Sequence, residues 1–195
     1  FDQCHVQHTV CTPSRCSFMT GWYPHNRGHR TLWHCLRPDE PNTLKYLKQA
    51  GYDVHWIGKN DLLAAESYDA SVTSVDERQW RDRVQDGTPA FEAGDPGAQS
   101  FLFQPMQTHN ADYFNMQQAV AYLKNRKPDD PPFMLFLAPT FPHCPYRAPQ
   151  PWHDMYDPSA LPPLRPAELT GKPGFYKLIR EYRGLDGADD ELYRK

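Results

Sequence analysis

The stretch of sequence that decides the fold covers residues 42–61 and reads NTLKYLKQAGYDVHWIGKND. Within it, Leu44 and Leu47 are spaced to lie on one face of a helix, and Gly51 is well placed to end that helix. Residues 52–57 then read as a strand, which is followed by a glycine, a lysine and an asparagine. A helix that leads directly into a strand is typical of a sheet with helices packed on its faces.

A second helix and strand are expected further along the chain. Asn110 can cap this helix, Asp112 suits its positive end, and Pro128 stops it. Residues 133–138 follow as a continuous apolar run, which is typical of a strand buried in a parallel sheet. The apolar face of the helix is expected to contain five residues: Tyr113, Phe114, Val120, Ala121 and Leu123.

The remaining stretches are shorter or irregular. Residues 1–10 alternate loosely and predict a strand or an extended approach to a short helix, which begins near Pro13 and is closed by Gly21. Residues 67–107 predict loops with a short hairpin at 101–103. The proline-rich residues 139–173 predict extended or turning backbone. The order of strands and helices predicts an α/β fold, a mostly parallel sheet with helices on both faces.

Composition and charge bound the function. The chain has 195 residues, 39% of them hydrophobic, which fits one globular domain. The net charge of -3 comes from intermixed acids and bases, so neither nucleic acid nor an anionic membrane surface is an expected partner. The longest apolar run is far short of the roughly 20 residues that cross a bilayer. The cysteine count of five is odd, so at least one thiol is free, modified or shared.

Three chemically loaded segments each follow a predicted strand: residues 11–15, 58–61 and 140–143. Ligands of open α/β sheets bind outside the carboxyl ends of the strands. The sequence therefore predicts one crevice that collects a nucleophile at Cys11, a lysine at Lys59 and a histidine at His143.

Cys11 is expected at the N-terminus of a helix, with Arg15 one turn later. Unpaired N–H groups, the helix dipole and a permanent positive charge would favour a tetrahedral oxyanion there. A plain reactive cysteine is also consistent with this setting.

Three motifs resemble the sulfatase family of the alkaline-phosphatase-like superfamily. Residues 11–25, CTPSRCSFMTGWYPH, resemble its Cys-x-Pro-x-Arg signature, in which the cysteine is converted to formylglycine and Thr-Gly closes the helix. Residues 51–62, GYDVHWIGKNDL, resemble its strand that ends in Gly-Lys, and residues 132–152, PFMLFLAPTFPHCPYRAPQPW, resemble its apolar strand before Pro-His-x-Pro. The resemblance implies a sulfuric ester hydrolase and a formylglycine-generating enzyme as a partner.

The resemblance also implies a role for each site residue. Formylglycine at position 11 would be the nucleophile, and Arg15 would stabilise it. Lys59 would bind the sulfate oxygens, and His143 would bind the bridging oxygen and protonate the leaving alcohol. A divalent cation, calcium or another such as Mg²⁺, would bind both formylglycine and the sulfate of a small-molecule or saccharide ester.

Two departures from the family pattern matter. The family commonly has Lys-Trp-His where this chain has Lys59, Asn60 and Asp61, so either Asp61 or His25 is expected to take over from the missing histidine. The acidic pair upstream of the cysteine and the metal ligands far downstream cannot be placed. Residues 1–195 are therefore expected to be part of a single sulfatase catalytic domain that lacks its first strand and its C-terminal metal-ligand portion. The metal ligands other than residue 11 would lie outside this chain, and such a piece need not turn over substrate by itself.

Three other functions stay open. The first is a phosphonate or phosphate ester hydrolase of the same superfamily, and the second is a fragment without activity. The third is a zinc-binding module, although no Cys-x-x-Cys knuckle supports it. Its candidate ligands would be Cys4, His5, His8, Cys11, Cys16 and His25. The natural substrate cannot be read from the sequence, and the location stays open among periplasm, exterior and cytoplasm.

Overall fold

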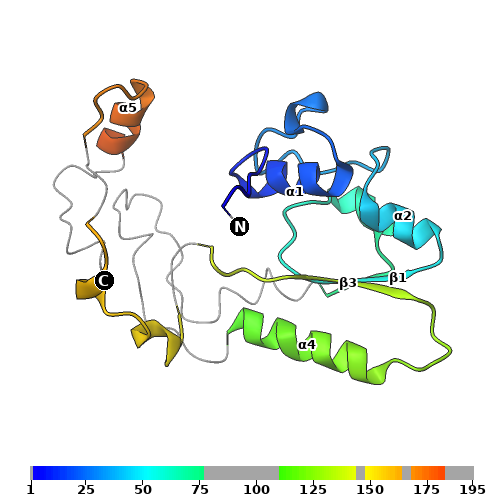
Figure 1. Cartoon of the computed structure of the whole chain (residues 1–195). Coiled ribbons are helices and arrows are strands. Elements are labelled where there is room, and N and C mark those ends of the chain that lie inside the picture. The colour runs from blue at the N-terminus through cyan, green and yellow to red at the C-terminus, as the bar shows by residue number, and fades with distance from the viewer. Residues whose placement is uncertain (1, 77–109, 144–147, 164–167, 183–195) are drawn as a thin grey trace. The chain divides into compact units, whose positions relative to one another are not determined.

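A computed structural model describes residues 2–76, 110–143, 148–163 and 168–182 of the chain (Figure 1). The chain divides into two compact units, which are described separately. The first consists of Phe1–Arg81 with Phe114–Pro139, and the second of Asp82–Tyr113 with Thr140–Lys195.

The first unit is built on a parallel sheet with the strand order β2-β1-β3. The strands are β1 at Asp53–Gly58, β2 at Ser74–Asp76 and β3 at Phe133–Ala138. β1 and β3 run in register along their whole length, so the ends of both strands, Gly58 and Ala138, lie side by side. The predicted α/β class and the two predicted strands at 52–57 and 133–138 are confirmed, the first of them shifted by one residue.

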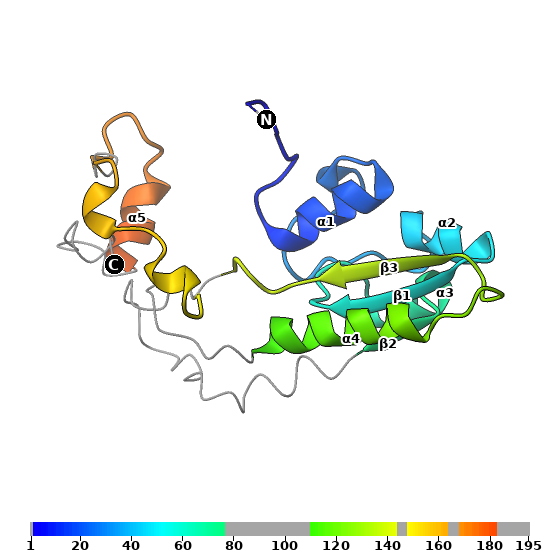
Figure 2. The same ribbon diagram turned by 60° about the horizontal axis from the view of Figure 1, so that its bottom comes forward.

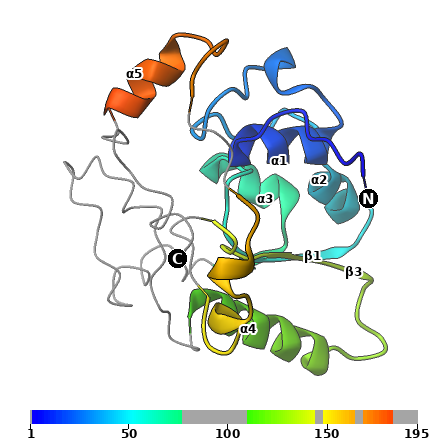
Figure 3. The ribbon, with the colours of Figure 1, turned by 60° about the vertical axis from the view of Figure 1, so that its left-hand side comes forward.

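Helices cover both faces of this sheet. The helices α1 at Cys11–Thr20 and α2 at Thr43–Gln49 lie on one face, and α4 at Ala111–Asn125 runs along the other (Figures 1 and 2). Figure 3 shows the same two sides from another direction. The expected placement of helices on both faces is confirmed.

Local contacts explain why α1 begins and ends where it does. The first helical hydrogen bond runs from Ser14 N to Val10 O at 3.0 Å, and Val10 itself is extended. At the other end Gly21 adopts a φ of 73°, and its N–H donates to Ser17 O at 2.9 Å. The helix closed by glycine is confirmed. Residues 2–10 form no strand, so they approach Cys11 as irregular chain.

The core lies between the sheet and the helices α1 and α2. Asn42 caps α2 by accepting from Lys45 N at 2.8 Å, and Leu44 of this helix is fully buried. The same core cluster contains apolar residues of β1, of the segment before α2 and of the loop after β1: Leu36, Val54, Trp56, Leu62 and Leu63.

The helix α4 begins with the predicted cap, because Asn110 accepts from Tyr113 N at 3.0 Å. The predicted apolar face of this helix is wrong: Phe114 is 55% exposed, and Val120 and Leu123 are also exposed. The buried face instead contains Asn115 and Ala119, and it includes Tyr122, whose hydroxyl donates to Asp53 of β1 at 2.7 Å. Arg126 donates to the same carboxylate at 3.0 Å. These polar contacts across the sheet, rather than apolar periodicity, fix the rotation of α4.

Two further expectations need correction. Residues 67–107 are not all loop, because a short helix α3 at Tyr68–Ser71, preceded by a 3-10 turn at Ala65–Ser67, leads into β2. The expected hairpin at 101–103 lies outside the described residues. The strand β3 is only partly buried, and its Phe133 is 42% exposed. Among the described residues β3 pairs with β1 alone, so one of its edges has no partner strand there.

The second unit contains short helical pieces. Two 3-10 turns stand at Trp152–Asp154 and Pro158–Ala160, as a proline-rich turning segment predicts, and a helix α5 at Phe175–Tyr182 was not expected. Among the helices of the described ranges, none combines the length and the apolar character that crossing a bilayer requires.

Candidate active site

Two of the three chemically loaded segments meet in the first unit. Cys11 is the first residue of α1, and Lys59 follows directly after β1. The ammonium nitrogen Nζ of Lys59 lies 3.9 Å from the sulfur Sγ of Cys11. The lysine is only 8% exposed. A nearly buried positive charge therefore faces the residue predicted as the nucleophile.

The backbone of Lys59 is held from two sides. Its N–H donates to Ala138 O at the end of β3 at 2.7 Å, and its carbonyl accepts from Nη1 of Arg15 at 3.0 Å. Arg15 thus ties the first turn of α1 to the end of β1. This contact fixes the distance between the helix that carries Cys11 and the strand that carries Lys59.

The glycine before the lysine allows the two strand ends to come this close. Gly58 has a φ of 110°, where side chains are rarely found. A Cβ atom built there would stand 2.2 Å from Ala138 O, which belongs to the backbone. Only glycine fits at this position.

Asp61 joins the same site. Its Oδ2 atom lies 3.0 Å from Lys59 Nζ as an ion pair, although the two atoms are not aligned as a hydrogen bond. This buried oxygen accepts no hydrogen bond from the described part of the chain. Burial of an ammonium group is costly without a counter-charge, and the carboxylate supplies it.

Asn60 shapes the turn between these two charges. Its side-chain oxygen accepts from the N–H groups of Leu62 at 3.0 Å and Leu63 at 2.9 Å, and its amide donates to Leu63 O at 2.9 Å. An asparagine that binds the backbone two and three residues on is a local turn former. Where the family has Lys-Trp-His, this chain therefore has a turn formed by Asn60, and Asp61 in this turn lies beside Lys59.

The structure does not bring His25 to Cys11. His25 lies in a 3-10 turn at Pro24–Asn26, after the C-terminal end of α1, where it is exposed and stacks on Tyr23. Cys11 is at the opposite end of the same ten-residue helix, and a helix of this length spans about 15 Å. Of the two candidates for the missing histidine, Asp61 is the one beside Lys59.

His143 belongs to the second unit. Its N–H donates to Thr140 O at 2.9 Å and closes a turn over residues 140–143. Its role as the acid stays a prediction.

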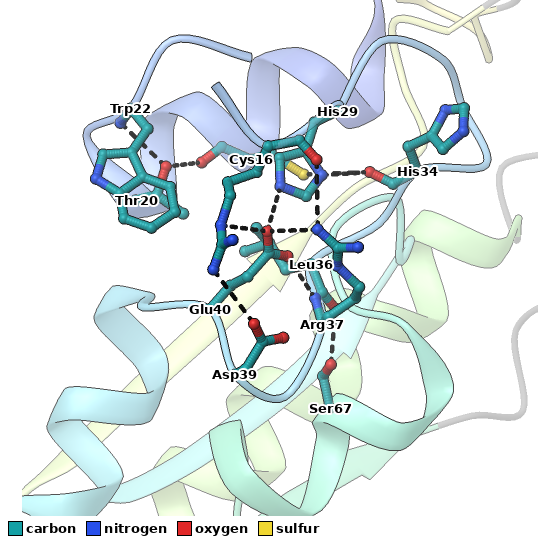
Figure 4. A network of polar contacts seen from close by, with 11 residues as sticks. Cys16, Thr20, Trp22, His29, His34, Leu36, Arg37, Asp39, Glu40 and Ser67 are labelled. Carbon is teal, nitrogen blue, oxygen red and sulfur yellow. Dashed lines mark hydrogen bonds and ion pairs between the residues drawn. The ribbon is translucent and has the colours of Figure 1, made fainter. Parts of the chain in front are cut away.

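A buried ionic network near α1 was missed at the sequence level. Glu40 is fully buried, and its carboxylate accepts from the backbone N–H of Arg37 at 2.8 Å and from the Arg37 side chain at 3.2 Å (Figure 4). His29 lies 3.1 Å from the same carboxylate, and its other ring nitrogen lies 2.6 Å from His34 O. Both ring nitrogens thus lie within hydrogen-bond distance of oxygen atoms. An acidic residue inside a loop gives no periodic signal, so only these contacts reveal the network.

These contacts set the pKa of Glu40. Burial acts to raise the pKa of the carboxyl group, but the hydrogen bonds from Arg37 and the charges of His29 and Arg37 outweigh it. The net effect holds the pKa of Glu40 below its ordinary value, so the group stays ionised. The network fixes the loop after α1 that lies against Cys16.

A metal site needs several ligand side chains close together. Across the described ranges, no three His, Cys, Asp or Glu side chains gather closely enough to hold a metal ion. The described residues around Cys11 therefore do not form a calcium site by themselves. The six candidate ligands of the zinc-binding alternative all lie in these ranges and do not gather either.

The fold and this site define the class of protein. It is an α/β domain with a parallel sheet and helices on both faces, and its middle strand leads into a lysine that lies beside a cysteine. The family model named Sulfatase matches residues 1–162, and the chain belongs to the sulfatase family. Members of this family generally use a formylglycine and a divalent metal.

Individual proteins are similar to this chain in sequence or in fold. The ulvan-active sulfatase of Formosa agariphila is 25% identical over 146 residues, which cover 75% of this chain and 23% of that protein. The structure of BT4656 in complex with its substrate D-glucosamine-2-N,6-O-disulfate shares the fold with a TM-score of 0.50 and 20% identity, over 73% of this chain and 27% of that chain. The phosphonate monoester hydrolase of Agrobacterium radiobacter does so with a TM-score of 0.57 and 18% identity, over 85% and 38% of the two chains. This chain thus spans under half the length of each of these proteins.

Proposed function

We propose that the protein hydrolyses sulfate esters with a formylglycine made from Cys11. The observation that carries the proposal is the ammonium group of Lys59, nearly buried and 3.9 Å from Cys11 Sγ at the start of α1. In the modified protein an aldehyde or diol oxygen would take the place of this sulfur atom. When present, formylglycine supplies an oxygen nucleophile that accepts the sulfuryl group and later releases it as sulfate.

The charged residues around position 11 would bind the sulfate group and stabilise the charge that develops during the reaction. Lys59 would bind sulfate oxygens and offset the charge that develops on the departing oxygen, and it would do so strongly because little water reaches it. Arg15 adds a second positive charge, and its side chain donates a hydrogen bond to the backbone carbonyl of Lys59. Asp61 would keep the ammonium group in place between the strand end and α1.

The remaining parts of the reaction are assigned from the sequence. His143 would hydrogen-bond the bridging ester oxygen and protonate the leaving alcohol. A divalent cation, calcium or magnesium, would be held by residue 11 together with ligands from outside this chain. The substrate class we favour is a saccharide or small-molecule sulfate ester, and a formylglycine-generating enzyme would act on Cys11.

The test uses the full-length protein, which would include the metal ligands from outside this chain, and its Cys11→Ala variant. We expect wild type to hydrolyse an aryl sulfate and the variant to lose at least about 10³-fold in kcat, because the nucleophile is gone. Mass spectrometry of the wild-type peptide that contains residue 11 should give a mass below that of the encoded cysteine. A Cys4→Ala variant is the control, since Cys4 is exposed and has no assigned role. Full activity in Cys11→Ala would contradict the proposal.

A second candidate reaction is phosphonate or phosphate ester hydrolysis with the same nucleophile. It is supported by the fold shared with the phosphonate monoester hydrolase. The same assay with an aryl phosphonate ester decides between them, because a sulfatase should show the higher kcat/KM on the sulfate.

A further inference from the structure

One carboxylate in the second unit holds the turn that carries His143. Asp112 accepts from the N–H of Thr140 with both of its oxygens, at 2.8 and 2.9 Å, and from the N–H of Phe141 at 2.8 Å. All of these residues belong to the second unit. Hydrogen bonds to an ionised acceptor are roughly twice as strong as neutral ones, so this carboxylate is a strong anchor for the turn.

The anchor and the turn together fix the backbone up to His143. Thr140 and Phe141 are bound through their N–H groups, and Pro142 has no N–H and a restricted φ. His143 N then donates to Thr140 O at 2.9 Å. Every backbone donor from 140 to 143 is thus occupied, and the chain between them has little freedom.

A second residue at the start of α4, Asn110, makes a cap contact of this helix. Its side-chain oxygen accepts from Tyr113 N. The carboxylate of Asp112 lies in the first turn, where the helix dipole favours a negative charge. The same carboxylate is turned toward residues 140 and 141, whose N–H groups donate to it.

We infer that Asp112 is a positioning residue for His143. Through the turn 140–143 it sets where the imidazole stands when the leaving alcohol takes up its proton. This inference rests on the proposed function, in which His143 is the acid. Asp112→Asn would remove the negative charge and would replace one acceptor oxygen by an NH₂ group, which cannot accept a hydrogen bond from Thr140 or Phe141. The turn would therefore loosen, although the volume of the side chain stays the same.

The experiment compares variants of the native protein on aryl sulfates with good and poor leaving groups. His143→Ala should slow the poor leaving groups most, because these need the proton. Asp112→Asn should show the same selectivity, with a loss of about 10- to 100-fold in kcat for poor leaving groups and little change for good ones. In the double variant Asp112→Asn should cost nothing further, since it acts through His143. An Asp112→Asn loss that is equal for all leaving groups, or that adds fully to that of His143→Ala, would overturn the inference.

A matched control and a second measurement distinguish the acid role of His143 from the positioning role of Asp112. Asn110→Ala removes the helix cap and should lower thermal stability without changing the leaving-group dependence. Amide hydrogen exchange at Thr140 and Phe141 should be faster in Asp112→Asn than in Asn110→Ala. If His143→Ala shows no selectivity while this exchange rises, the acid role fails and the positioning of the turn stands. Unchanged exchange in Asp112→Asn would refute the positioning role itself.

Discussion

Two thiols of the same short helix have very different surroundings. Cys11 is half-buried beside the ammonium group of Lys59, whereas Cys16 is 1% exposed and packs in the core. Burial, together with the nearby Cys35 and Glu40, raises the pKa of Cys16 to about 12. The backbone contacts of Leu36 oppose this shift only in part. Of the two thiols on α1, only the one at the first position of the helix is therefore accessible.

This difference predicts which thiols react in the native state. At pH 8 only about one Cys16 in ten thousand would be a thiolate, so iodoacetamide should leave it unmodified while the exposed Cys4 reacts. Peptide mass mapping after alkylation measures both. In urea the two residues should react alike, which is the control. Equal labelling of Cys16 and Cys4 in the native protein would contradict the burial of Cys16.

At the scale of elements, the closeness of two strand ends sets the site. β1 and β3 finish together at Gly58 and Ala138, and the next residue, Lys59, is bound to both β3 and α1. The position of the lysine is thus a property of three elements rather than of a flexible loop. A side chain between the strand ends would push them apart.

Gly58→Ala and Gly51→Ala test this close approach as a pair. Both glycines have positive φ, but a Cβ at Gly58 meets Ala138 O at 2.2 Å, and one at Gly51 meets nothing within 4 Å. We expect Gly51→Ala to lower the free energy of unfolding by about 1–2 kcal/mol, and Gly58→Ala by more than about 4 kcal/mol. Urea denaturation measures both. Similar losses in the two variants would show that the strand ends tolerate a side chain.

At the scale of the molecule, the network around Glu40 couples stability to pH. The carboxylate is fully buried and joins His29 and Arg37, and Arg27 Nε lies 3.8 Å from it. Since its pKa is lowered in the folded state, the unfolded chain binds the proton more readily. The stabilisation is therefore complete above the ordinary glutamate pKa of about 4.3 and is lost as pH falls through the lower folded value.

Glu40→Gln should remove this pH dependence. At neutral pH we expect the variant to be less stable by about 1–3 kcal/mol, because charged hydrogen bonds to a buried group are lost. The gap to wild type should shrink as pH falls below about 4, where wild type also loses the charge. Denaturation curves at several pH values measure the gap, with Glu66→Gln as a control, since Glu66 is exposed. A gap that stays constant with pH would contradict the assigned pKa direction.

The sequence by itself determined the elements α1, α2, β1, α4 and β3 and the candidate nucleophile. Helix α1 with Cys11 at its start, the strand before Lys59 and the helix behind Asn110 follow from caps, glycines and periodicity, which act within a few residues. The family signature rests on local motifs in the same way. Such short-range rules need no knowledge of the rest of the chain.

Only the tertiary structure decided how these elements face each other. The buried side of α4 depends on Tyr122 and Asp53, which are 69 residues apart, and the contact of Lys59 with Cys11 spans 48. The anchor of Asp112 on Thr140 spans 28. Polar side chains carry no periodic signal, so their partners emerge only when packing brings distant segments together and burial makes each unpaired group costly.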